Sequence, residues 1–378
     1  MPSIFITIPW FSPAFKAGGP IQSIVNMVNE LNSGYRFYIY TSNSDLNGEP
    51  IAVAQVNEWL PFNEHTKVWY ATNKNRSENL ISQVAAIRPD WIYMIGMFSW
   101  HFTLVPLFYG RAPHKLLSVR GMLHPGALEQ KSLKKKWFLQ AMKTVGLTKK
   151  TIFHATDLVE QEHIASAFGP KAQVRVAANF PRLLTQQPAA AKEPGSLRLV
   201  SVGIVSPMKN YLLVLQALEN VDATIEYNIY GPVKDAAYWE TCLEQIKKLP
   251  ANIVVHFHRE IPTHKIPAKL EGQHVFILPS VSENYGHAII EALSAGLPVI
   301  TSQNLPWQGL EENKAGMNIE PSADTIADAI TQFAAMNNET YSIYSQAAAN
   351  YAREQVNLTE LTAIYSSLFE TTINDAAV

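Results

Sequence analysis

Short apolar runs alternate with longer amphipathic segments along almost the whole chain. The apolar runs have the length and composition of buried strands, and they lie at residues 3–8, 35–41, 91–95, 114–119, 151–155, 197–203, 224–230, 253–257, 274–278 and 298–302. The segments between them are helical, at 20–33, 77–88, 127–146, 157–168, 210–220, 236–249 and 286–296. Strands that alternate with helices favour parallel sheets covered on both faces, so the pattern predicts an α/β protein.

The number of strands and one polar segment indicate two domains. About ten strands are more than one typical sheet contains. Residues 184–196 are polar, rich in proline and alanine and without periodicity, which predicts a linker. We therefore expect an N-terminal domain at 1–183 and a C-terminal domain at 197–355. The pattern from Ala323 onwards is helical only, and residues 356–378 are expected to form a C-terminal helix that packs back on the N-terminal domain.

Composition excludes several classes of protein. Of the 378 residues, 47% are apolar and 16% are charged, which excludes a disordered or coiled-coil chain. Lysine and arginine number 30 against 32 acidic residues, and the net charge of −2 does not favour a nucleic-acid-binding protein. The single cysteine, Cys242, excludes an intrachain disulfide and a cysteine-rich metal site and is typical of a reducing cytoplasm.

Two apolar stretches have the length or position of a targeting or membrane segment. No basic residue precedes the run at 3–8, so this run is expected to be a first strand and not a signal peptide. Residues 91–110 contain no charged side chain and are long enough to span a bilayer. Ser99, His101 and Pro106 interrupt them, which favours a buried strand that continues into a helix.

The segment at 279–302 has the features of a phosphate-binding turn. A buried strand ends before it, a helix begins near Gly286, and Gly296 ends that helix. The backbone amides of residues 286–288 are therefore at a helix N-terminus, where anions bind well. Glu283 lies in the loop just before the helix, and Glu291 lies one turn beyond His287. These residues alone also allow a capping carboxylate at Glu283 and an exposed helix carboxylate at Glu291.

Two further positions suggest an anionic ligand. Lys209 lies at the start of the helix at 210–220, where its charge opposes the helix dipole unless an anion is bound; the alternative is a solvated lysine after a strand. Gly18 and Gly19 precede Pro20 in the first turn of a helix, and glycines let backbone amides approach a ligand; most such pairs are only turns. The sequence has no Asp-x-Asp triplet, no cluster with metal-ligand spacing and no Gly-x-Gly-x-x-Gly after a strand, so neither a metal nor a cofactor is predicted.

The segment at 282–302, with Pro306-Trp307, resembles the signature of family-4 retaining glycosyltransferases of the GT-B fold, in the branch that assembles bacterial polysaccharides. The core of that signature is two glutamates separated by seven residues, here Glu283 and Glu291. Residues 203–210 resemble a second stretch of the family, with Lys209 at its lysine and Ile204 where an arginine is expected.

The N-terminal half extends the resemblance. Gly18-Gly19 matches the family's first loop, and residues 118–123 resemble its Pro-Arg-Gly segment. Many relatives have a histidine near this strand end that approaches the transferred sugar; here the position is Arg120, with His101 and His124 nearby. Because Ile204 stands where the family has an arginine, the resemblance implies fewer cationic contacts to the diphosphate.

The resemblance implies two Rossmann-like domains whose parallel sheets face a central cleft, with the acceptor side in the N-terminal domain. It implies a retaining, metal-independent hexosyltransferase that moves a sugar from a UDP- or GDP-sugar to a saccharide or lipid-linked saccharide in bacterial surface polysaccharide synthesis. The departing diphosphate would help to deprotonate the acceptor. Glu283 would bind the donor sugar and Glu291 the ribose. The implied catalytic residues are Glu283, Lys209 and Arg120, and the implied donor-binding residues are Gly18, Gly19, Lys209, Asn284, Tyr285, Gly286, His287, Ala288 and Glu291.

Two other functions were considered. A non-catalytic nucleotide-sugar-binding protein is compatible with the missing arginine at Ile204. A nucleotide-sugar epimerase has the same architecture but needs additional acid and base carboxylates in the N-terminal domain, where no clear candidates are found.

A basic segment suggests where such an enzyme works. Residues 130–150 contain seven lysines and no acidic residue, interleaved with Leu133, Trp137, Phe138, Leu139 and Met142. A basic amphipathic helix of this kind predicts peripheral contact with anionic lipid, at the inner face of the cytoplasmic membrane. The alternative is a solvated basic face on a helix packed against the core.

Overall fold

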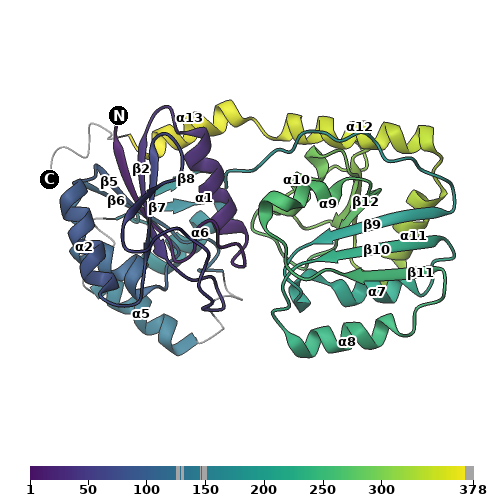
Figure 1. The fold of residues 1–378 in the computed structure, drawn as a ribbon, viewed down its shortest axis with the longest axis horizontal. Coiled ribbons are helices and arrows are strands. Elements are labelled where there is room, and N and C mark those ends of the chain that lie inside the picture. Colours follow the sequence, from purple (N-terminus) through teal and green to yellow (C-terminus); the bar gives the residue numbers. More distant parts are fainter. Residues whose placement is uncertain (125–127, 129–131, 145, 147–150, 371–378) are drawn as a thin grey trace. The chain divides into compact units, whose positions relative to one another are not determined.

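The computed structural model describes residues 1–124, 128, 132–144, 146 and 151–370. The chain divides into two compact units (Figure 1). Unit 1 comprises Met1–Phe180 and Leu358–Val378, and unit 2 comprises Pro181–Asn357. Each unit contains one mainly or wholly parallel sheet, so the predicted α/β class with two parallel-sheet domains is confirmed.

The sheet of unit 1 has the strand order β3-β4-β2-β1-β5-β6-β7-β8, and only β3 runs antiparallel to its neighbour. Its strands are β1 (Ser3–Thr7), β2 (Arg36–Ser42), β3 (Trp59–Pro61), β4 (Thr66–Ala71), β5 (Trp91–Ile95), β6 (His114–Ser118), β7 (Ile152–Ala155) and β8 (Val174–Val176). The sequence predicted five of these strands and missed β3, β4 and β8. Both edge strands, β3 and β8, are only three residues long, too short to show a period.

Helices of unit 1 bury both faces of this sheet. They are α1 (Gly19–Glu30), α2 (Arg76–Ile87), a π-helical turn at Trp100–Leu104, α3 (Val105–Tyr109), α5 (Ser132–Thr144), α6 (Leu158–Phe168) and α13 (Leu358–Leu368). One core joins Ile4 and Ile6 of β1 to α1 and α13, and the other joins Phe5 to α2, α5 and α6. Neighbouring residues of β1 thus enter opposite cores, as expected for a strand buried on both sides.

The chain returns to unit 1 through α13. The Nη1 atom of Arg175 donates to the carbonyl oxygens of Ser367, Leu368 and Glu370, at 3.3, 2.7 and 3.1 Å. Tyr365 packs against His154 and Phe180, with ring centroids 5.7 and 4.9 Å away. A cation that bonds the last carbonyls of a helix also compensates the negative end of its dipole.

The sheet of unit 2 is wholly parallel, in the order β11-β10-β9-β12-β13-β14. Its strands are β9 (Ser196–Val202), β10 (Thr224–Tyr230), β11 (Ile253–Phe257), β12 (Val275–Leu278), β13 (Val299–Ser302) and β14 (Gly316–Ile319). The sequence predicted all but β14, which contains a glycine and an asparagine. The order reverses between β9 and β12, and ligands of open α/β sheets bind beyond the carboxyl ends of strands at such a reversal.

The helices of unit 2 connect these strands. They are α7 (Tyr211–Leu218), α8 (Ala236–Ile246), α9 (Ile266–Leu270), α10 (His287–Ser294), α11 (Ala323–Ala335) and α12 (Asn338–Gln355), with 3-10 turns at Pro207–Lys209 and Thr263–Lys265. The wholly helical pattern predicted after Ala323 agrees with α11, α12 and α13.

Residues 184–196, predicted as a linker, lie on unit 2. The Leu184 amide donates to Ser294 Oγ at 2.9 Å, and the Gln187 amide donates to the Ala295 carbonyl at 3.0 Å. The Lys192 ammonium is buried and donates to the carbonyl of Glu193 and to two carbonyls at the end of α11, those of Ala334 and Met336. The boundary between the units lies just before this segment, at Phe180 and Pro181.

The uncharged stretch at 91–110 folds as β5, the π-helical turn and α3. No helix in the described part of the chain is both long enough and apolar enough to cross a membrane.

Candidate functional site

Hydrogen bonds join two loops at the carboxyl edge of the sheet of unit 2. One loop follows β9 and the other follows β12, the two strands where the sheet order reverses. The Val281 amide donates to the Met208 carbonyl at 2.9 Å, and Asn210 Nδ2 donates to the Pro279 carbonyl at 2.8 Å. These bonds fix the relative positions of the two loops on which the sequence places Lys209 and Glu283.

Lys209 and Glu283 form an ion pair across these loops. The Lys209 ammonium donates to Glu283 Oε1, and Ser280 Oγ donates to the same oxygen at 2.8 Å. The exposed fractions of the two side chains are 19% and 12%. Lys209 is therefore not a solvated lysine, and the structure brings together two residues that are 74 positions apart in sequence. Ser280 was not predicted, since a serine after a strand has no distinctive pattern.

Gly286 gives α10 its sharp start. Its φ of 77° and ψ of 50° lie in the left-handed region, and a Cβ here would lie 3.1 Å from Trp307 Nε1. That indole nitrogen donates to the Tyr285 carbonyl at 2.7 Å, and the two rings meet edge to face at 5.2 Å. Trp307 thus holds the turn before α10, a role that the sequence did not reveal. The first amides of a helix have no acceptor within it, so the amides of residues 286–288 suit an anion.

Glu291 is a buried carboxylate on α10. It is 3% exposed, and its Oε1 has no hydrogen-bond partner among the described residues. Burial raises the pKa of Glu291 to about 7, and the positive charge of Arg182 opposes that rise. The alternative of an exposed helix carboxylate is therefore wrong. A buried polar group without a partner costs free energy, so such a group indicates a ligand that completes its hydrogen bonds.

The glycine loop of unit 1 is braced by a buried aspartate. Gly18, with φ at 69°, precedes α1, which begins at Gly19 and has Pro20 in its first turn. The Asp45 carboxylate accepts from the amides of Phe15 and Lys16, at 2.9 and 3.2 Å. Asp45 is 5% exposed, and it was missed because a single aspartate in a loop has no distinguishing pattern.

Arg120 lies inside unit 1. Its Nη1 donates to Ser23 Oγ and its Nη2 to the Tyr93 hydroxyl, both at 3.2 Å. His154 Nε2 is 2.8 Å from the Ala177 carbonyl and so has the proton, and the Tyr93 hydroxyl donates to His154 Nδ1 at 2.7 Å. Burial and the charge of Arg120 lower the pKa of His154 to about 3, which keeps the ring neutral. Arg120 is thus one member of an internal hydrogen-bond network.

The other histidines considered near Arg120 have local contacts. His101 Nδ1 is 2.8 Å from Ser77 Oγ, and the ring of His124 lies 5.4 Å from that of His163. Across the described ranges, no group of three or more His, Cys, Asp or Glu side chains could hold a metal ion.

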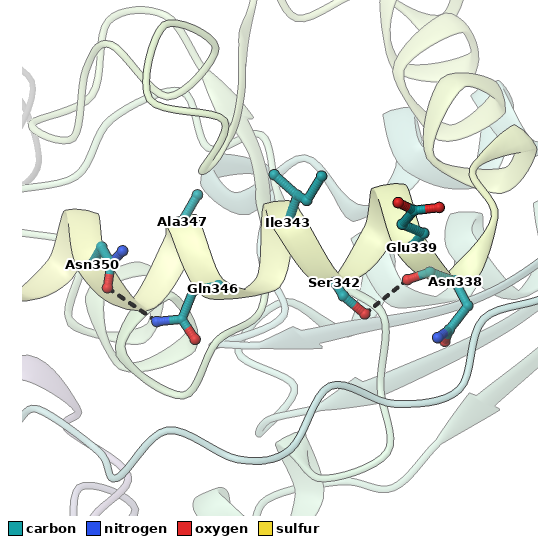
Figure 2. A pocket seen from close by; sticks show the side chains of 7 residues that line it. All are labelled: Asn338, Glu339, Ser342, Ile343, Gln346, Ala347 and Asn350. Carbon is teal, nitrogen blue, oxygen red and sulfur yellow. Dashed lines mark hydrogen bonds between the residues drawn. The ribbon is translucent and has the colours of Figure 1, made fainter.

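A surface hollow of unit 2 lies along one face of α12 (Figure 2). Within it, Ser342 Oγ donates to the Asn338 carbonyl at 2.7 Å, and Gln346 Nε2 donates to Asn350 Oδ1 at 3.1 Å. The full lining is Asn338, Glu339, Ser342, Ile343, Gln346, Ala347 and Asn350. None of the predicted site residues lines it, so we place the site at the loops after β9 and β12.

The basic segment at 130–150 is only partly described. Lys131, Lys149 and Lys150 lie outside the described residues, as do the side chains of Lys134 and Lys136. The Lys135 ammonium lies 5.3 Å from the centroid of the Phe98 ring. Trp137 of α5 is 75% exposed, and Met142 is buried in the core.

Comparison with solved structures identifies the fold. The two parallel-sheet units have the GT-B fold: sucrose-phosphate synthase from Thermosynechococcus elongatus matches with a TM-score of 0.70 at 16% identity, covering 98% of both chains. Anabaena HepE, solved in complex with UDP and glucose, matches with a TM-score of 0.67 at 14% identity, over 97% of this chain and 99% of HepE.

Two sequence comparisons found similar proteins. Residues 185–355 match the family model "Glycosyl transferases group 1". A Salmonella typhimurium protein, provisionally assigned as the colanic acid biosynthesis glycosyltransferase WcaL, is 24% identical over 196 residues. That match covers 48% of this chain, which thus spans about half (47%) of the length of this relative.

Proposed function

We propose that this chain is a retaining glycosyltransferase of family 4 that transfers a sugar from a nucleotide diphosphate-sugar to a saccharide or lipid-linked saccharide in bacterial surface polysaccharide synthesis. The observation that supports it most is the joined pair of loops after β9 and β12, where Lys209, Glu283 and the start of α10 meet. The group 1 domain and the similarity to a relative assigned to colanic acid biosynthesis agree with it.

The chemistry follows from charge. As the bond between sugar and diphosphate breaks, negative charge grows on the diphosphate, and the Lys209 ammonium with the amides of residues 286–288 stabilises it. The leaving diphosphate accepts the proton of the acceptor hydroxyl on the face that it leaves, so no separate protein base is needed. Glu283, oriented by Ser280 and Lys209, accepts hydrogen bonds from the donor sugar's hydroxyls.

The remaining donor contacts are assigned by the same proposal. Glu291 accepts from the ribose hydroxyls, which would satisfy its buried Oε1. Asn284, Tyr285 and His287 line the donor. HepE, a structural neighbour, was solved with UDP and glucose. Since the Arg120 guanidinium is engaged by Ser23 and Tyr93, we assign it the positioning of α1 and of the turn after β6.

A panel of UDP- and GDP-sugars tests the proposal. A ligand that binds only the folded state raises the thermal midpoint, so the true donor should stabilise the chain more than the free nucleotide. That donor should then be consumed with an added saccharide, giving a product of unchanged anomeric configuration. Stabilisation without turnover would instead identify the non-catalytic binding protein. Conversion of the donor to an epimer without an acceptor would identify the epimerase, and no response to any nucleotide would contradict all three.

We further propose that the enzyme is cytoplasmic and contacts anionic lipid through 130–150. Exposed Trp137 supplies an apolar, interfacial side chain next to the lysines. Each lysine near an anionic surface contributes roughly 1 kcal/mol. Sedimentation with anionic vesicles should fall at high salt and fall when Lys134, Lys135 and Lys136 are replaced by glutamine. Equal binding to neutral and anionic vesicles would contradict the lipid contact and would support the alternative, a solvated basic face on a helix packed against the core.

A further inference from the structure

Arg182, the second residue of unit 2, uses few of its hydrogen-bond donors within the described chain. The guanidinium group has five N–H donors. Among the residues that the structure describes, its single hydrogen bond joins Nη1 to the Thr263 carbonyl, at 3.3 Å. Thr263 begins the turn that follows β11, at the carboxyl edge of the same sheet that presents Lys209 and Glu283. Four donors of a half-buried cation thus remain available at this edge.

The backbone next to Arg182 is attached to the helix of Glu291. The Leu184 amide donates to Ser294 Oγ at 2.9 Å, and that hydroxyl donates to the Glu291 carbonyl at 2.9 Å. Arg182 is close enough to Glu291 for its charge to lower the carboxyl pKa, yet no hydrogen bond joins the two side chains. Glu291 Oε1, which has no partner, and Arg182, which has unused donors, therefore belong to one hydrogen-bonded part of unit 2 without satisfying each other.

We propose that Arg182 is a nucleotide-binding residue whose guanidinium donates to the first phosphate of the nucleotide, beside the ribose that Glu291 holds. The inference rests on the proposed function, because it assumes a nucleotide at this edge. A diol and a phosphate are neighbouring groups in any nucleotide, and they match a carboxylate acceptor next to a cationic donor. Lys209, the other cation of the site, forms an ion pair with Glu283 and is assigned the charge that grows on the leaving diphosphate, so the contact proposed for Arg182 is an additional one.

The choice of phosphate follows from chemistry. Arginine has a planar fork of donors that fits phosphate oxygens in a bidentate manner, and it keeps its charge when partly buried. A ribose hydroxyl needs an acceptor more than a cation, and Glu291 provides it. The bond to Thr263 fixes one edge of the guanidinium, which reduces the entropy lost when the other edge binds.

Isothermal titration of the full chain with UDP, UMP and uridine, or with the guanosine series if GDP binds more tightly, tests this inference. Arg182→Gln removes the charge but keeps a donor for the Thr263 carbonyl, whereas Arg182→Lys keeps the charge. Arg198→Gln is the matched control, because Arg198 also bonds one loop carbonyl, that of Gly272 at 2.5 Å, but lies near the amino end of β9. Thermal midpoints of all variants report folding.

We expect Arg182→Gln to weaken UDP and UMP about tenfold, the loss typical of a hydrogen bond to a charged group, and to change uridine less than about twofold. Arg182→Lys should recover part of the loss, and Arg198→Gln should bind like the wild type. Equal losses for UMP and uridine, or no loss at all, would overturn the inference while the wild type still binds UDP or GDP. A wild type that binds neither nucleotide would overturn the proposed function together with the inference.

Discussion

Two equally buried glutamates, one in each unit, have opposite surroundings. Glu160 of unit 1 and Glu291 of unit 2 are both 3% exposed and both lie on helices. Glu160 lies in the first turn of α6, where its Oε2 accepts from the Thr156 amide at 2.6 Å and from the Thr156 hydroxyl at 2.9 Å, and its Oε1 accepts from the Gly121 amide. Glu291 lies further along α10, and its Oε1 accepts nothing.

The difference separates a structural carboxylate from the one that we propose binds the ribose. Glu160 satisfies backbone groups of two loops and adds a favourable charge at a helix N-terminus, so its burial stabilises unit 1. The Oε1 atom of Glu291 is buried without a hydrogen bond, and the charge of Arg182 offsets only part of the cost of burial, so the burial of Glu291 destabilises unit 2 in the absence of a ligand. Burial alone therefore does not distinguish a binding carboxylate from a structural one. The number of hydrogen bonds that the buried carboxylate makes within the protein separates the two cases.

The largest effect should come from Lys209, the cation that is paired with a third carboxylate, that of Glu283. Lys209→Ala should lower turnover on the order of 100-fold, because loss of one preorganised charge donor costs about 3 kcal/mol in the transition state. Steady-state assays with the donor found by the panel measure it. Lys248→Ala, an exposed lysine after α8, is the control. Unchanged turnover of a folded Lys209→Ala variant would remove Lys209 from the site.

Replacement of each buried glutamate by glutamine should change the free energy of unfolding, in opposite directions for Glu160 and Glu291. Glu160→Gln should destabilise by about 3 kcal/mol, because charge-assisted bonds to backbone amides are lost. For Glu291, the folded-state pKa of about 7 lies above the ordinary 4.5, so the folded chain binds the proton more tightly. Stability therefore falls as the pH rises from about 4.5 to about 7, and Glu291→Gln should stabilise at pH 8 by up to about 3 kcal/mol.

Urea titrations at pH 5 and pH 8 measure both changes. The gain from Glu291→Gln should largely disappear at pH 5, where the native carboxyl is already neutral. Destabilisation by both substitutions at pH 8 would show that the Glu291 carboxylate has a hydrogen-bond partner in solution. It would contradict the proposed difference between Glu160 and Glu291.

Nucleotide binding should depend on the ionisation of Glu291. The ribose hydroxyls need an ionised acceptor, so UDP affinity should rise about tenfold between pH 6 and pH 8, as a group with a pKa near 7 loses its proton. Glu291→Gln should bind UDP weakly and show only the pH dependence of UDP itself. Glu283→Gln should keep the UDP profile and lose turnover, since it faces the sugar. Wild-type affinity for the Glu291 variant would show that the ribose binds elsewhere.

The smallest expected effect is that of a chelator. Since lysine and helix amides neutralise the diphosphate in this proposal, treatment with EDTA should change turnover by less than about twofold. Dialysed enzyme with and without EDTA, each also supplied with Mg²⁺ or Mn²⁺, provides the comparison. Strict dependence on an added divalent ion would mean that the charge of Lys209 and the amides is insufficient.

Loop residues show where prediction from the sequence stops. The turn before α10 was predictable because glycine, polar residues and the following helix are neighbours in sequence, and local backbone preference determines them. The roles of Ser280, Asp45 and Trp307 were not predicted, since each acts on a group that is distant in sequence or lies in an irregular loop. Arg120 was predicted to be catalytic from its place after a strand, but the sequence could not show that its guanidinium donates to Ser23 of α1 and Tyr93 of β5.

By itself, the sequence determined the two-domain α/β class, most strands and the positions of Glu283, Gly286 and Glu291 around one helix start, because apolar periodicity and turn chemistry act over a few residues. Only the tertiary structure decided which polar groups meet. The strand order places the loops after β9 and β12 side by side and so pairs Lys209 with Glu283. It also decided that Glu160 finds its donors while Glu291 does not, since the hydrogen bonds of a buried carboxylate depend on the distant segments that packing brings to it.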